Sequence, residues 1–275
     1  MRRSVHRKPR DRFKAVLRKI LLALMAVLVA FPVLYLFSSS LFAPRDFGNL
    51  RLFPSAPRWS NYAKVFALGD FRRQIINSIG TAVLASAVRT AVIVLAAFAL
   101  THLHFRGKGL ALSFLVMTLF IPQEAVLYQN YRTVAALGLL DSWTGIICTS
   151  LFSAAQMLLL TGSFSAIGRE PYDAARIDGA SDLRYIRSVL VPLCTPAVLT
   201  VMIQTLITVF NSYLWPLLVT NRPKTRTIQT GLTMLGFAES GETGAQMAAI
   251  AVMTLPFLIL LAFAKKKIEN ALIRK

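Results

Sequence analysis

The sequence predicts an all-α membrane protein with six transmembrane helices. Hydrophobic residues make up 55% of the 275 residues, and the mean hydropathy of +0.57 is far above that of a soluble domain. A helix needs roughly 20 consecutive, mostly apolar residues to cross a bilayer. Six runs meet this requirement, at 20–42, 75–100, 110–129, 143–164, 189–219 and 245–264. The first run is too long for a cleaved signal peptide, and we expect it to stay as a span.

The distribution of Lys and Arg predicts the orientation. With six spans the two termini lie on the same side of the membrane. If that side is the cytoplasm, 20 of the 31 Lys and Arg residues are cytoplasmic, which fits the positive-inside rule. We therefore expect a multi-pass membrane protein with cytoplasmic N- and C-termini. The expected parts are a basic tail (1–19), a six-helix transmembrane domain (20–264) with cytoplasmic loops at 101–109 and 165–188, and a C-terminal tail (265–275).

Composition and motifs argue against several other classes of protein. The formal charge of +19 comes from short patches between apolar runs, so nucleic acid is not an expected partner. Cys148 and Cys194 have no metal-ligand spacing, and we expect no metal site. No phosphate-binding G-x-x-x-x-G-K-[ST] loop and no catalytic motif occurs, so we expect neither a nucleotide site of this kind nor an enzyme active site. His102 and His104 are expected to be solvated in the 101–109 loop.

The 165–188 loop contains an unusual polar stretch, "REPYDAARIDGASDLRYIRSVLVPL". Pro171 suits the first turn of a helix, Gly179 suits a left-handed stop, and Ser181 suits the N-cap of a second helix. We expect Tyr172, Ala175 and Ile177 to make the apolar contacts of the first helix. From the residues alone, this helix either lies on the bilayer surface or docks in a groove of another protein.

Part of this stretch, "DAARIDGASDLRYIRSVLVPL", resembles the EAA loop of binding-protein-dependent ABC importer permeases, which has the form E-A-A-x3-G-x9-I-x-L-P. Asp173 takes the place of the Glu, and Val189 and Val191 take the places of Ile and Leu. Weaker similarities to the carbohydrate-type subgroup occur in the expected order along residues 15–270. They are Asn61–Tyr62, Asn77–Ser78, Phe105–Gly109, Gly138–Ile146, Asn211–Val219 and Gln246–Pro256. The C-terminal "ENALIRK" lacks the Gly-rich tail of many such permeases.

The resemblance implies a type I ABC importer permease fold in the bacterial inner membrane. It also implies a permease subunit for a carbohydrate, that is, a transporter subunit without its own ATPase site and not an enzyme. It implies as partners a second, different permease chain, two ATPase subunits that bind ATP and Mg, an extracytoplasmic substrate-binding protein and membrane lipid. The loop would be the coupling helix that contacts the ATPase, through Glu170, Tyr172, Asp173, Ala174, Ala175, Arg176, Asp178 and Gly179. The alternatives are import of sn-glycerol-3-phosphate or a related polyol phosphate by the same machinery, and an ion-coupled secondary carrier. The absence of an intramembrane acidic cluster argues against the carrier.

Polar and aromatic residues within the spans are candidates for the substrate pathway, because such groups are costly in a membrane unless they are paired or face water. Arg89 either forms an ion pair within the bundle, with Glu124 as a plausible partner, or faces the pathway. Asn211 and Trp215 are four residues apart and are expected to share a helix face. Packing between helices is the alternative role for this group. The candidates are Arg89, Gln123, Glu124, Tyr128, Asn130, Gln204, Asn211, Tyr213 and Trp215.

Overall fold

The computed structural model describes residues 9–49, 51–67, 69–234 and 242–273. These residues form helices and contain no strand, so the all-α prediction is confirmed for them. Residues 1–8 of the expected basic tail and 274–275 of the expected C-terminal tail lie outside the described part. The chain divides into two compact units, one formed by 1–67 and 236–254 and the other by 68–235 and 255–275.

The first unit begins with α1 (Pro9–Ser39), so helix already starts within the expected tail. It continues with η1 (Pro44–Asn49) and α2 (Ser60–Ala67). Asn61 is buried, and its side-chain amide donates to the carbonyls of Ser40 and Phe42 at 2.9 and 3.0 Å. These carbonyls lie just after the end of α1, so no following helical turn supplies N–H groups to bond them. The long helix α14 (Thr243–Ile273) starts in this unit and contains the predicted 245–264 run.

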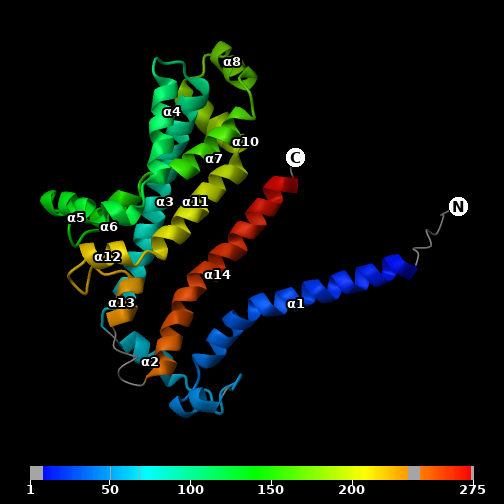
Figure 1. Cartoon of the computed structure of the whole chain (residues 1–275), viewed down its shortest axis with the longest axis vertical. Helices are drawn as coiled ribbons and strands as arrows, with labels where there is room; N and C mark the ends of the chain where they lie inside the picture. Colours follow the sequence, from blue (N-terminus) through cyan, green and yellow to red (C-terminus); the bar gives the residue numbers. More distant parts are fainter. Residues whose placement is uncertain (1–8, 50, 68, 235–241, 274–275) are drawn as a thin grey trace. The chain divides into compact units, whose positions relative to one another are not determined.

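The second unit is organised around α3 (Phe71–His102), with α7 (Ala154–Ser165) and α11 (Thr195–Phe210) packed along it (Figure 1). At 1.5 Å per residue, the 32 residues of α3 span about 48 Å, well beyond the ~30 Å of bilayer hydrocarbon. Large apolar side chains from all three helices fill the core between them, among them Ile93, Met157, Leu160 and Val201.

Shorter helices complete the second unit. They are α4 (Lys108–Met117), η2 (Thr118–Phe120), η3 (Gln123–Val126), α5 (Leu127–Ala136), α6 (Trp143–Ile147), η4 (Cys148–Ser150), α8 (Glu170–Ile177), α9 (Asp182–Tyr185), the π-helical η5 (Ile186–Leu190), α10 (Val191–Leu193), α12 (Leu214–Val219) and α13 (Ile228–Met234). The helix that Ser181 caps thus continues without a break from Asp182 to Leu193, with a π-helical segment in its middle. Pro192 has no N–H to pair with a carbonyl one turn earlier, and a π-turn accommodates this locally.

Three of the expected spans are bent rather than continuous. Among the described residues, two helices, Leu17–Ser39 and Phe71–His102, are long and apolar enough to cross a membrane unbroken, and up to five crossings exist if each bent pair is one span. The bends are 94° between Lys108–Phe120 and Gln123–Ala136, 58° between Trp143–Ser150 and Ala154–Ser165, and 89° between Asp182–Leu193 and Thr195–Phe210.

Each bend has a local cause. Ile121 precedes Pro122 and is held in an extended conformation, which ends the helix before it. Ser153 is also extended, and its hydroxyl caps α7 by accepting from the Gln156 N–H at 3.5 Å. Cys194 leaves helical geometry just before α11, which has Pro196 in its first turn.

Asn77 and Ser78 attach a distant loop to α3. The Asn77 amide donates to the carbonyls of Lys224 and Arg226 at 2.9 and 3.0 Å, and its oxygen accepts from the Trp143 indole at 3.0 Å. The Ser78 hydroxyl accepts from the Ile228 N–H at 2.8 Å. The side chains of Asn77 and Ser78 therefore supply hydrogen-bond partners to backbone groups of the loop that would otherwise be unpaired.

Asp141 holds the other end of the same loop. One carboxylate oxygen accepts from the N–H groups of Asn221 and Arg222 at 2.7 and 2.9 Å and from the Thr225 hydroxyl at 2.8 Å. The backbone of Asp141 is left-handed, at φ 56°, which Asp tolerates better than most residues. Partial burial by itself raises the pKa of Asp141, but the three hydrogen bonds, with the nearby Arg222 charge, hold that pKa below its ordinary value.

We expect Asp141→Asn to lower the free energy of unfolding by roughly 1–2 kcal/mol at pH 7, because hydrogen bonds to an ionised carboxylate are stronger than hydrogen bonds to a neutral amide. A depressed pKa in the folded state stabilises the fold fully above the ordinary value of 3.8, and this contribution disappears as the pH falls through the folded pKa. Thermal unfolding at pH 7 and at successively lower pH values measures the difference between wild type and variant. The difference should shrink only below about pH 4, and a difference independent of pH would contradict the assignment.

Candidate functional site

The helix α8 is ended by a left-handed glycine. Gly179 has φ 75°, its N–H donates to the Arg176 carbonyl at 3.1 Å, and the Ala180 N–H donates to the Ala175 carbonyl at 2.9 Å. This pattern is the Schellman motif, in which glycine avoids the strain that other residues meet at positive φ. Ser181 then caps α9 by accepting from the Arg184 N–H at 3.4 Å. The predicted turn and cap are both confirmed.

An aromatic cluster attaches α8 to the rest of the second unit. It consists of Phe98 and His102 from α3, Tyr172 from α8 and Tyr185 from α9, with ring centroids 5.1–6.3 Å apart. The His102 ring is buried, 3% exposed, and its Nδ1 lies 2.7 Å from the Thr101 hydroxyl. The expectation that His102 is solvated is therefore wrong, because α8 and α9 fold back over the end of α3.

Tyr172 anchors α8 from within this cluster. Its ring is buried, and its hydroxyl donates to Asp182 at 2.9 Å. Burial and the hydrogen bond to the Asp182 carboxylate both favour the neutral phenol and raise the pKa of Tyr172. Since the ring faces the chain's own core, Tyr172 positions α8 and does not present a surface to another molecule. Ala175 packs beside it against the same core.

The opposite face of α8 is open. The exposed residues here are Glu170, Asp173, Ala174, Ile177 and Asp178. The first four are spaced i, i+3, i+4 and i+7, which places them on one face of the helix. Of the three expected apolar contact residues, Tyr172 and Ala175 pack against the chain's own core, whereas Ile177 is 87% exposed. Arg176 is exposed as well and lies 3.4 Å from Asp182. The short helix α8 (Figure 1) is thus held against the core on one side, and on its other side the exposed Ile177 lies among charged residues.

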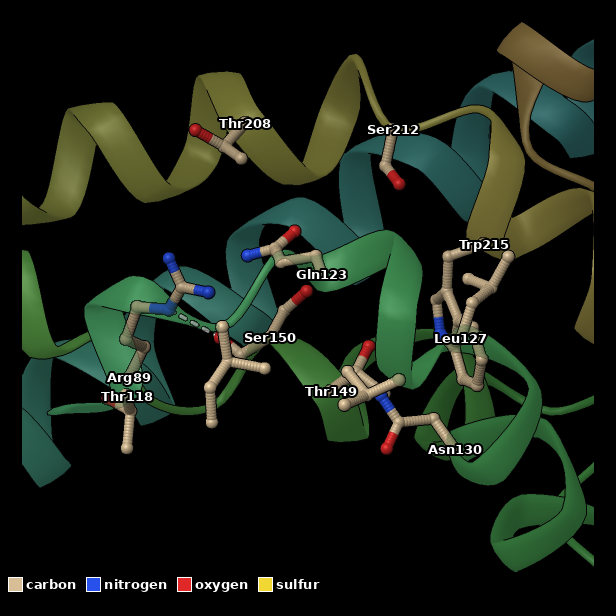
Figure 2. Close-up of a pocket in the computed structure, with 12 residues that line it drawn as sticks. Arg89, Thr118, Gln123, Leu127, Asn130, Thr149, Ser150, Thr208, Ser212 and Trp215 are labelled. Atoms are coloured by element: carbon tan, nitrogen blue, oxygen red, sulfur yellow. Dashed lines mark hydrogen bonds between the residues drawn. The ribbon is translucent and has the colours of Figure 1, made fainter. Parts of the chain in front are cut away.

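A cavity of about 360 Å³ in the second unit is lined by both polar and apolar side chains (Figure 2). It forms where the chain leaves helical geometry, around the breaks at 120–123, at 148–153 and at 211–213. Within a bilayer, non-helical backbone is tolerated only where it is buried in protein or lines a water-filled space. The lining residues are Arg89, Thr118, Ile121, Gln123, Val126, Leu127, Asn130, Thr149, Ser150, Thr208, Ser212 and Trp215.

Arg89 is held at one side of this cavity. It comes from the middle of α3 and is 7% exposed, and its Nε donates to the carbonyl of Ser150. That carbonyl is available because η4 ends at Ser150 and α7 begins only at Ala154. No ion pair joins Arg89 to Glu124 or to any other acidic residue in the described part of the chain. Of the two alternatives for Arg89, the ion pair with Glu124 is therefore absent, and Arg89 lines the cavity. The bend at Pro122 places Glu124 among exposed residues outside the cavity lining.

Four predicted pathway residues, Arg89, Gln123, Asn130 and Trp215, line one cavity, and the remaining five do not. The exposed Tyr128 and Tyr213 are outside the lining, as is Glu124. Gln204 accepts from Gln156 at 3.3 Å and thereby joins α11 to α7, which corresponds to the packing alternative.

Asn211 and Trp215 do not share a helix, so that expectation is wrong. The helix α11 ends at Phe210 and α12 begins at Leu214. Asn211 accepts from Gln229 at 3.3 Å, whereas the buried Trp215 indole donates to the carbonyls of Gly145 and Ile146, each at 3.1 Å.

Sequence reasoning missed five hydroxyl-bearing residues of the cavity. They lie within a few residues of a helix break, which was the available signal, although two of the three breaks contain no proline. The missed residues are Thr118, Thr149, Ser150, Thr208 and Ser212.

The fold and the sequence together define the class of this protein. Residues 11–274 match the family model described as "Binding-protein-dependent transport system inner membrane component". The chain belongs to this family, and it is therefore an integral inner-membrane permease component of an ABC importer, a transporter subunit rather than an enzyme.

Individual relatives are similar over most of their length. The chain is 28% identical to the sulfoquinovosyl glycerol transport system permease protein SmoH of Agrobacterium fabrum, over 93% of this chain and 91% of that protein. It is 29% identical to the sn-glycerol-3-phosphate transport system permease protein UgpE of the same species, over 82% and 83%. It is also 29% identical to the trehalose transport system permease protein SugB of Mycobacterium tuberculosis, over 88% and 89%.

Solved structures have the same fold. A chain of a bacterial ABC transporter involved in the import of the acidic polysaccharide alginate matches with a TM-score of 0.83 and 25% identity, over 96% of this chain and 99% of that chain. A chain from an alginate ABC transporter in complex with alginate pentasaccharide-bound periplasmic protein matches with a TM-score of 0.62 and 14% identity. The predicted type I ABC importer permease fold is thus confirmed.

Proposed function

We propose that this chain works with a second, different permease, two ATPase subunits and an extracytoplasmic binding protein to import a carbohydrate or a polyol derivative. The chain forms part of the translocation path, and ATP with its magnesium ion is bound by the ATPase subunits alone. The named relatives transport sulfoquinovosyl glycerol, sn-glycerol-3-phosphate and trehalose, which supports a sugar or polyol derivative as the cargo.

The observation that supports coupling to an ATPase is the free face of α8. A short exposed helix gains little by folding alone and is marginal in isolation. Here the Gly179 turn, the bond from Tyr172 to Asp182 and the aromatic cluster fix it at the end of α3. A helix fixed in this way transmits a push from a docked subunit directly to α3, which lines the cavity through Arg89. The exposed Asp173, Ala174, Arg176, Ile177 and Asp178 are the proposed contact residues, with Glu170 beside them.

We propose a six-span topology with both termini in the cytoplasm. The two unbroken spans and the three bent pairs would give five crossings, and the apolar part of α14 would be the sixth. In this topology α8 lies in the cytoplasm, where the ATPase subunits are. The loop from Asn221 to Arg226, fastened by Asp141, lies on the opposite side, where the binding protein delivers its cargo.

Reconstitution of the complete importer in proteoliposomes tests this function. The chain is co-expressed with its co-encoded partners, and uptake is measured with and without MgATP and the binding protein. Uptake that requires both supports an importer. A secondary carrier would instead transport in the absence of ATP and respond to an imposed ion gradient, and that result would replace the proposal.

A further inference from the structure

The cavity contains a positive charge that the described part of the chain does not neutralise. Arg89 is deeply buried near the middle of α3, and no acidic residue occurs among the residues lining the cavity. Arginine remains protonated in proteins. A charge at this depth of a membrane is normally paired or faces a water-filled cavity, and it marks a functional path by default.

The hydrogen bond to Ser150 orients this charge and does not cancel it. A carbonyl accepts one N–H and supplies no full negative charge, and only the Nε of Arg89 is used in the bond. In Figure 2 the dashed hydrogen bond to Ser150 starts at Nε, and no dashed line reaches either terminal guanidinium nitrogen. Within the described part of the chain these two nitrogens have no hydrogen-bond partner, so the planar fork that suits carboxylate, sulfonate or phosphate oxygens is free.

The polar groups around Arg89 are suited to the same kind of ligand. The side-chain amides of Gln123 and Asn130 line the cavity, and neither makes a side-chain hydrogen bond to another described residue. Each offers two N–H donors. The Thr118 and Thr208 hydroxyls are different, since they already donate to carbonyls of their own helices at 2.6 and 2.8 Å and remain available as acceptors. Donors to an oxyanion and acceptors for sugar hydroxyls are therefore both present.

We infer that the cavity receives a negatively charged group of the transported solute, so that the cargo is an anionic carbohydrate or polyol, with Arg89 as the residue that selects for the charge. The inference rests on the proposed importer function and narrows its substrate class. A neutral sugar would leave the guanidinium fork without a counter-charge. An anionic group would accept hydrogen bonds from the Arg89 guanidinium, while Gln123 and Asn130 bind the hydroxyls or further oxygens of the solute.

Uptake by whole cells that express the complete importer tests the inference. The probes are sulfoquinovosyl glycerol, sn-glycerol-3-phosphate and an alginate oligomer, which are anionic, and trehalose, which is neutral. We expect uptake of an anionic probe, and a fall of about tenfold or more in Arg89→Gln, the usual cost of losing a charged hydrogen bond. Arg89→Lys keeps the charge and should retain more uptake than Arg89→Gln. Arg132→Gln, which changes an exposed arginine outside the cavity lining, should transport like the wild type.

Preference for trehalose, or undiminished uptake of an anionic probe by Arg89→Gln, would overturn the inference. If none of the four probes is taken up, mass spectrometry of the solute that copurifies with the binding protein identifies the cargo, and a cargo without a negative group overturns it too. Co-purification of the ATPase with Arg89→Gln shows that the variant is folded. Loss of the ATPase already from the wild-type preparation would instead count against the importer function itself.

A lipid phosphate is the other source of a negative group in a membrane cavity. Native mass spectrometry of the importer in detergent distinguishes the two sources. A phospholipid that stays bound to wild type and is lost from Arg89→Gln, together with unchanged uptake, would assign the charge to lipid and overturn the solute assignment. With a solute ligand we expect no such difference in bound lipid, and we expect the uptake defect.

Discussion

Ile177→Arg is expected to abolish ATP-driven uptake while leaving the permease folded. Ile177 is 87% exposed on the free face of α8 and makes no contribution to the aromatic cluster behind it. An arginine at this position costs the isolated chain little, because surface substitutions change stability by about 0.5 kcal/mol or less. At a docked interface the same change would bury an unpaired charge in place of an apolar side chain. Changing such an anchor residue lowers the free energy of binding by about 2 kcal/mol or more.

The measurement compares uptake, ATPase co-purification and thermal stability of the same preparation. Leu137→Arg is the matched control, since Leu137 is also a well-exposed apolar residue but lies at the end of α5. We expect the control to retain the ATPase. Normal uptake by Ile177→Arg would mean that the free face of α8 is not a docking surface.

Tyr185→Ala is expected to lower the free energy of unfolding by roughly 3–5 kcal/mol, the range found when a large buried aromatic side chain is removed. Tyr185 is 1% exposed and is among the largest fully buried side chains of the described residues. Its ring contacts Phe98, His102 and Tyr172, which belong to α3 and α8. Its removal should therefore loosen α8 and weaken coupling as well as stability.

Tyr185→Phe separates packing from hydrogen bonding in this cluster. The Tyr185 hydroxyl is 3.4 Å from the His102 Nε2, a weak contact, so the phenylalanine variant should differ from wild type by less than about 1 kcal/mol. Thermal unfolding and uptake are measured for both variants. Equal losses in Tyr185→Ala and Tyr185→Phe would show that the hydroxyl, and not the ring packing, holds α8.

Local signals in the sequence were sufficient for the helices and for the turn of the coupling loop. The left-handed Gly179 and the Ser181 cap follow from short-range backbone chemistry, and both are present. The break at Pro122 was indicated by a proline in an apolar run. The break between Cys148 and Ser153 was not, because no residue there forbids helix and the bend arises from the extended Ser153 and its cap on α7.

Contacts between distant parts of the chain explain the remaining differences. His102 was expected to be solvated because it was assigned to the 101–109 loop, whereas the residues that bury it, Tyr172 and Tyr185, lie 70 or more positions later. Arg89 looked like one half of an ion pair, yet its partner is a backbone carbonyl freed by a helix break. Hydropathy and residue spacing do not reveal which backbone carbonyl lacks a partner within its helix, or which rings from different helices pack together.

A cross-link from α8 tests most directly whether this helix couples the permease to an ATPase. Ile177→Cys is placed in the complete importer, treated with a short bifunctional reagent, and the adduct is mapped by mass spectrometry. Cys148 and Cys194 are present in every preparation, so Leu137→Cys controls for reactions at the native thiols. A covalent link between position 177 and the co-purified ATPase is the predicted result. An ATPase that co-purifies but links only elsewhere on the chain would contradict the assignment of α8 as the coupling helix.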